Sequence, residues 1–142
     1  MTQLCRSLAV AAFAGALIGC ASQSLGLPAE LRGTTWKWTG MTTPVETIAV
    51  DAPERYTIAF PEEGRIALRA DCNRGSEQYS VGADRRIAFG PIVLTRVACP
   101  PGSLSDRYVR EVERATSFFI KDGALFLELP VDSGTLRFER VG

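Results

Sequence analysis

The stretch that decides the fold is YTIAFPEEGRIALRA, residues 56–70. Large apolar side chains recur at every second position in its first and last parts, at Tyr56, Ile58 and Phe60 and then at Ile66 and Leu68. The PEEG segment between them, residues 61–64, has the composition of a turn. Alternation with a period of two on both sides of a short turn predicts an antiparallel hairpin with one buried face.

Short segments of the same kind run along the rest of the chain. We expect them at residues 35–39, 47–50, 78–81, 85–89, 92–98, 117–120, 125–129 and 135–139, with a break at 73–75 and a tight turn at 121–123. The first of them, TWKWT, places Trp36 and Trp38 on one face. About eight short antiparallel strands close readily into a small barrel. The expected fold is therefore mainly β (α+β), a small antiparallel β-barrel or strongly curled sheet with one helix.

The helix is expected after Pro100-Pro101-Gly102. Four apolar residues recur there at helical spacing and form one stripe, namely Tyr108, Val112, Ala115 and Phe119. Ser103 or Ser105 is a suitable N-cap, and Arg107 and Glu111 form an i, i+4 pair on the polar face.

The N-terminus has the pattern of a secretion signal. One cation, Arg6, precedes an apolar run at residues 8–18, which is shorter than the roughly 20 residues a spanning helix needs. The run ends in Leu-Ile-Gly-Cys at 17–20, which resembles the lipobox of bacterial lipoproteins. We expect residues 1–19 to be a signal peptide and Cys20 to carry the lipid; an ordinary signal peptide that ends near a cysteine is the alternative.

The same resemblance implies a cellular location. Acyl chains on Cys20 would hold the protein on a membrane, since stable anchoring takes more than one chain. Ala21, a residue other than Asp, points to the outer membrane, with the protein facing the periplasm. Residues 20–30 are expected to be a lipidated N-terminus and flexible tether, and residues 31–142 the folded domain.

Composition limits the function classes. Removing 19 residues from 142 leaves 123, enough for one domain, and the 15 cations and 16 anions that remain give a net charge of −1. The sequence has no stripe of basic residues of the kind that indicates nucleic-acid binding. The chain has no His, which excludes Ser-His and Cys-His nucleophile pairs and His metal sites. We expect no enzyme activity, no cofactor and no metal.

Four cysteines are present. Cys5 leaves with the signal and Cys20 is acylated, so Cys72 and Cys99 remain. In an oxidising periplasm such a pair is typical of a disulfide, and two buried free thiols are the alternative.

Two cysteine-containing motifs resemble those of a known family. Asp71-Cys72-Asn73, followed by Gly75 and Tyr79, and Thr95-Arg96-Val97-Ala98-Cys99 are similar to motifs of the META domain family, of the HslJ type of bacterial envelope lipoprotein. Trp36, the helix and the Gly123 turn also match, so the resemblance covers residues 31–141. Two residues depart from the pattern, because Asp71 replaces a Gly and Val97 replaces a Met. The first departure suggests a different backbone turn before Cys72, or a variant branch.

The resemblance implies an antiparallel sheet with a helix, an envelope location, and a link to heat-shock induction and novobiocin resistance. It implies a structural pair in Cys72 and Cys99 but no catalytic residue. Candidate recognition residues are Trp36, Trp38, Asp71, Asn73, Arg74 and Thr95. For the Trp pair the alternative is a place in the core, and for residues 71–74 it is turn chemistry.

Three functions remain open at this point. The first is a non-enzymatic, membrane-anchored envelope lipoprotein in envelope or heat and antibiotic stress tolerance. The second is a periplasmic β-barrel that binds a small ligand in its interior. The third is a lysozyme or protease inhibitor. The expected partners are the membrane, through Cys20, and an envelope protein or a small ligand.

Overall fold

The computed structural model describes residues 26–142. The expected signal peptide, the expected lipidation site Cys20 and the first part of the expected tether lie outside these residues. The core already includes Leu27 and Leu31, so the end of the expected tether packs against the domain.

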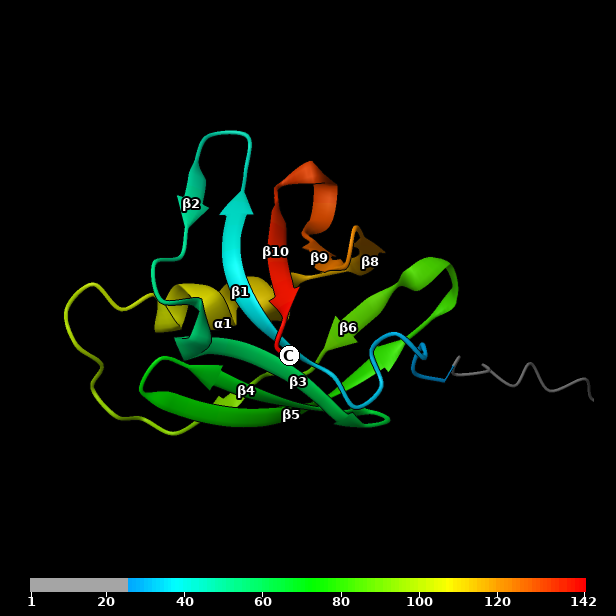
Figure 1. Ribbon diagram of the computed structural model, residues 1–142, viewed down its shortest axis with the longest axis horizontal. Coiled ribbons are helices and arrows are strands. Elements are labelled where there is room, and N and C mark those ends of the chain that lie inside the picture. The colour runs from blue at the N-terminus through cyan, green and yellow to red at the C-terminus, as the bar shows by residue number, and fades with distance from the viewer. Residues whose placement is uncertain (1–25) are drawn as a thin grey trace, which may run out of the picture.

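Ten strands and one α-helix are present in this part of the chain (Figure 1). The strands are β1 (Thr35–Thr42), β2 (Thr47–Ala49), β3 (Tyr56–Glu62), β4 (Arg65–Ala70), β5 (Asn73–Val81), β6 (Ile87–Phe89), β7 (Val93–Leu94), β8 (Ser117–Lys121), β9 (Ala124–Glu128) and β10 (Thr135–Arg140). The helix is α1 (Ser105–Arg114), and short 3-10 turns lie at Pro53–Arg55, Ala83–Arg85 and Pro130–Asp132.

Eight strands form a nearly closed antiparallel barrel, as the sequence predicts. Their order is β6-β5-β4-β3-β1-β10-β9-β8, with β2 on β1 and β7 on β5. The hairpin expected at 56–70 is confirmed, with Ile58 opposite Leu68. The two ends of the sheet meet at one place only in the described chain, where Arg86 bridges to Ser117 and the Ile87 amide donates to the Thr116 carbonyl at 3.0 Å. We call the junction between these two ends the seam.

The helix covers the inner face of the curled sheet. In Figure 1 it lies behind β1 and above β4 and β5. Its residue Tyr108 is fully buried and contacts the rings of Trp38 on β1, Tyr56 on β3 and Phe138 on β10. The barrel interior is thus filled by side chains from both the sheet and the helix, and the interior that the small-ligand alternative would use is a packed core.

Three local expectations are wrong. Residues 73–75 do not break the chain but begin β5, because Ala70 pairs directly with Asn73 and the turn falls at Asp71 and Cys72. The helical stripe does not extend to Phe119, since α1 ends at Arg114 and Ala115 is extended, whereas the strand expected at 117–120 is confirmed as part of β8. Only Val93 and Leu94 of the segment 92–98 form a regular strand.

The N-cap expectation is also wrong. The N-cap position is held by Leu104, whose side chain makes no capping hydrogen bond. Ser103, one residue earlier, still contributes, because its Oγ accepts from the Ser105 amide at 3.2 Å. The Ser105 side chain is buried and its Oγ has no partner among the described residues.

The turn expected at 121–123 is confirmed. Asp122 and Gly123 connect β8 to β9, and Lys121 pairs with Ala124. Both turn residues have positive φ, 51° and 76°, as a two-residue type I′ hairpin requires.

Candidate functional site

Most of the expected site residues gather where β4 turns into β5. The disulfide between Cys72 and Cys99 lies there, with Cα atoms 5.5 Å apart. It joins the start of β5 to the end of the segment that follows β7, and both cysteines are partly exposed. The cross-link therefore holds residues 93–99 along one edge of β5.

The Asn73 side chain makes most of the hydrogen bonds that hold this region together. Its buried Oδ1 accepts from the Val97 amide at 2.8 Å and from the Thr95 hydroxyl at 2.9 Å. Its Nδ2 donates to the Val97 carbonyl at 3.0 Å and lies 3.4 Å from both cysteine sulfurs. The Asn73 side-chain amide thus binds residues 95–97 beyond Leu94, where the regular β5–β7 pairing ends.

Asp71 precedes the disulfide in an unusual backbone conformation. Its φ is 60°, in the left-handed region, which Gly adopts at least cost and which Asp tolerates. The carboxylate is buried and pairs with Arg55, and the Asp71 amide donates to the Arg55 carbonyl at 2.7 Å. The turn thus has a geometry that a Gly would also accept, and the substituted side chain ties it to the 3-10 turn at 53–55.

The remaining candidate recognition residues divide by exposure. Trp36 and Trp38 are buried in the core, so they line no exposed cleft. The Trp36 indole donates to Thr34 Oγ1 at 2.7 Å, whereas the Trp38 indole nitrogen has no partner in the described chain. Arg74 and Thr95 are exposed. Thr95 Oγ1 accepts from the Arg74 amide at 3.1 Å, so it also holds the edge segment in place.

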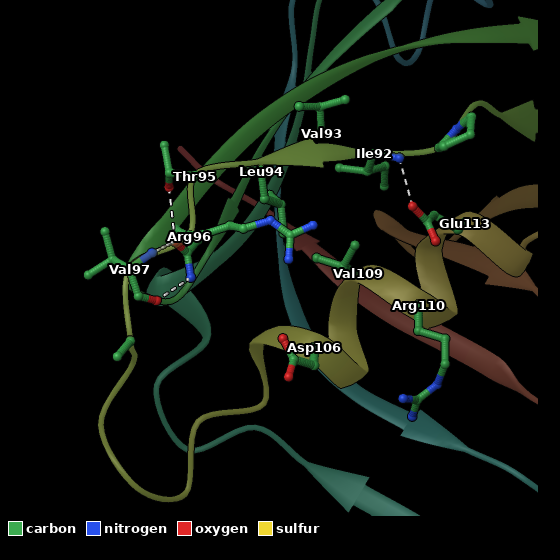
Figure 2. Close-up of a pocket in the computed structure, with 13 residues that line it drawn as sticks. Ile92, Val93, Leu94, Thr95, Arg96, Val97, Asp106, Val109, Arg110 and Glu113 are labelled. Atoms are coloured by element: carbon green, nitrogen blue, oxygen red, sulfur yellow. Dashed lines mark hydrogen bonds between the residues drawn. The ribbon is translucent and has the colours of Figure 1, made fainter.

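A groove opens beside this region, between the segment 91–98 and α1 (Figure 2). Its volume is about 650 Å³. Leu94 and Val109 point into it from the two sides, and the Arg96 side chain extends along it. At one end the Ile92 amide donates to Glu113 Oε1 of the helix at 2.6 Å. We call it the edge groove; it is lined mainly by residues 91–98 and α1 and includes neither residue of the Arg86–Ser117 bridge.

Close packing of the edge segment depends on Gly75. Gly75 lies opposite Leu94 in the β5–β7 pair. A Cβ at this position would lie 2.4 Å from the Val93 carbonyl oxygen and 2.6 Å from Leu94 Cδ2. The glycine therefore allows the wall of the groove to approach β5.

The sequence missed the role of Glu111. It was expected on the polar face of the helix, yet only 4% of the residue is exposed. Three arginines surround its carboxylate, with Arg114 at 2.7 Å and Arg107 and Arg110 each at 3.5 Å. Arg107 also pairs with Glu46 in the β1–β2 loop, so the cluster ties the helix to the sheet. The arginines at i−4, i−1 and i+3 were the available sequence signal.

Two absences concern the described residues. Residues 26–142 contain no group of three or more His, Cys, Asp or Glu side chains arranged to hold a metal ion. No helix in the same range is long and apolar enough to cross a membrane.

These features define a class of protein, a nearly closed antiparallel barrel that is filled by one helix and has a disulfide-linked edge segment. The profile of the META domain matches residues 29–141. The chain therefore belongs to the META domain family, as its motifs predict.

A solved structure supports the same fold. The crystal structure of a DUF4847 family protein from Bacteroides vulgatus superposes with a TM-score of 0.57 at 12% sequence identity. The match covers 77% of this chain and 93% of that protein. Among curated proteins, none is significantly similar in sequence.

Proposed function

We propose that the protein is a lipid-anchored META-domain protein of the bacterial envelope, which acts without catalysis by binding a partner on its surface. Its role would be in envelope stress tolerance, against heat or antibiotics such as novobiocin. The observation that carries the proposal is the Cys72–Cys99 disulfide at the edge of the barrel. Such bonds persist in oxidising compartments and are rare in the cytosol of most organisms.

Three further observations support this proposal. The segment 17–20 places a lipobox-like cysteine ahead of the domain. The barrel interior is occupied by Trp38, Tyr108 and Phe138, so the molecule offers its outer surface and not its interior to a partner. The absence of His from the sequence agrees with a role that needs no general base.

The anchoring is tested by expressing the full chain and its Cys20→Ser variant in a diderm bacterium. We expect the original chain to fractionate with the outer membrane and to yield an acylated N-terminal Cys20 by mass spectrometry. The Cys20→Ser variant should lose both properties. Cys5→Ser is the matched control, because it removes a cysteine from the segment that the signal peptidase discards.

The stress role is tested in a deletion strain of the source organism. Complementation with the original chain should restore growth at raised temperature and on novobiocin, and Cys20→Ser should not. An unmodified N-terminus would refute the anchoring, and equal growth of the deletion strain under both stresses would refute the stress role.

A further inference from the structure

We propose that the edge groove binds an extended peptide segment of a partner protein. The segment would add as a strand to the free edge of residues 94–98 and place an acidic side chain against Arg96. This inference rests on the proposed function, which assumes that the protein binds a partner on its surface; here we give the chemistry of that partner.

The first argument is the direction of the backbone amides. The amides of Thr95 and Val97 donate toward β5, to the Arg74 carbonyl at 2.9 Å and to Asn73 Oδ1 at 2.8 Å. Successive amides of an extended chain point to opposite sides. The amides of Leu94 and Arg96 therefore point away from β5 and toward α1.

Ile92 provides a direct check of this direction. It is even-numbered, like residues 94 and 96, and its amide donates across the groove to Glu113 Oε1 on α1 (Figure 2). Beyond Ile92 no such contact continues, and the Arg96 amide has no hydrogen-bond partner within residues 26–142. An extended peptide satisfies a row of unpaired strand-edge groups better than any other ligand.

The second argument is the apolar surface of the segment. Val93 is 72% exposed and Val97 58% exposed, although β-branched residues are typical of the half-buried surface of a sheet. Leu94 and Val109 supply apolar contacts inside the groove. A peptide with β-branched or aromatic residues at alternate positions would cover these side chains in a cross-strand arrangement.

The third argument is charge. The Arg96 guanidinium reaches into the groove and forms no ion pair with the described residues (Figure 2). On the helix side Glu113 already accepts from Ile92, and Arg110 lies 3.5 Å from Glu111. Arg96 is therefore the cation in the groove that is free to bind a carboxylate of the peptide. Asp106 on the helix also lines the groove, and its negative charge disfavours a second acidic residue in the peptide.

The test uses the full chain purified in detergent and a displayed library of random octapeptides. Selection should enrich peptides in which β-branched or aromatic residues alternate with other residues around one Asp or Glu. The Arg96→Pro variant serves for counter-selection. Proline removes the amide that faces the groove and leaves the amides that bind β5 unchanged.

A fluorescein-labelled enriched octapeptide then gives the affinities by anisotropy. Arg96→Ala keeps the amide and loses the charge, so we expect binding about three- to fivefold weaker. Arg96→Pro should weaken it by about a further fivefold, the effect of one lost hydrogen bond. Arg96→Lys should bind within about twofold of the original chain. Methylation of alternate peptide nitrogens should abolish binding.

Three results would overturn the inference. They are no peptide enriched over Arg96→Pro, equal binding of the N-methylated peptide, or a groove already covered by a second copy in a concentration-dependent dimer. None of them depends on acylation or on growth under stress. Failure here is therefore distinguishable from failure of the proposed function.

Discussion

Tyr108 of the helix stacks on Trp38 of β1, with ring centroids 5.2 Å apart and an interplanar angle of 25°. Both side chains are fully buried. The pair joins the helix to the middle of the barrel, and it leaves the Tyr108 hydroxyl and the Trp38 indole nitrogen without hydrogen-bond partners in the described chain. A polar atom buried in this way costs about 1–3 kcal/mol.

Replacing Tyr108 by Phe should therefore stabilise the protein. The ring keeps its contacts and the unpaired hydroxyl is removed, so we expect the free energy of unfolding to rise by up to about 1 kcal/mol. Tyr108→Ala should lower it by about 3–5 kcal/mol, because it leaves a large cavity. Urea denaturation followed by Trp fluorescence measures both. A Phe variant that is clearly less stable would mean that the hydroxyl has a partner.

Stability should fall at alkaline pH. Burial raises the pKa of Tyr108 well above the ordinary tyrosine value of 10.0, and burial is also the main cause that raises the pKa of Tyr79. Above pH 10 the unfolded chain loses these protons while the folded chain keeps them, so unfolding is favoured as the pH rises. The fall of the free energy of unfolding with pH should be shallower in Tyr108→Phe than in the original chain. Below pH 9 the two proteins should show the same pH dependence. Denaturation at stepped pH values tests this, and equal alkaline slopes would contradict it.

Loss of the disulfide should be costly. Cys72 and Cys99 are 27 residues apart, and a loop of this length corresponds to about 3–4 kcal/mol in the chain-entropy model. The Cys72→Ala, Cys99→Ala double variant should lose about that much. Hydrogen exchange should become faster at the Thr95 and Val97 amides and stay unchanged in β9. Uniform acceleration across the barrel would show that the cross-link does more than hold the edge segment.

Asn73→Ala should release the same segment without breaking the disulfide. It removes three hydrogen bonds to Thr95 and Val97, so the expected loss is about 2–4 kcal/mol. Arg74→Ala is the matched control, since its side chain is exposed, and should change stability by less than about 0.5 kcal/mol. Thermal unfolding of the two variants gives the comparison. Similar losses of stability in both would show that the Asn73 side chain does not hold residues 95–97 in place.

Gly75→Ala should push β7 away from β5. The new methyl group would meet the Val93 carbonyl oxygen at 2.4 Å, and overpacking of this kind costs about 1–3 kcal/mol. Gly82→Ala is the control, because its nearest contact would be Arg86 Cβ at 3.7 Å and its φ of −106° suits any residue. The two melting temperatures test this, and a Gly75→Ala protein as stable as the control would show that the edge segment yields freely.

Local patterns were sufficient for much of the fold. The alternation at residues 56–70 predicted the β3–β4 hairpin, and the turn at Asp122 and Gly123 was expected from its residue types. The end of the helix was harder to place, because Phe119 falls on the apolar stripe of the helix although it is paired in β8. The start of β5 was misplaced because the turn depends on one left-handed residue, Asp71.

What the sequence determined by itself was the order of strands and helix, the family, and the pair of cysteines available for a cross-link, because period, turn chemistry and motif spacing are local. Only the tertiary structure decided that Glu111 is buried among arginines, that Trp36 and Trp38 belong to the core, and that a groove with a free strand edge opens between β7 and α1. Each of these depends on which elements far apart in the chain come to lie side by side, and no local pattern encodes that contact.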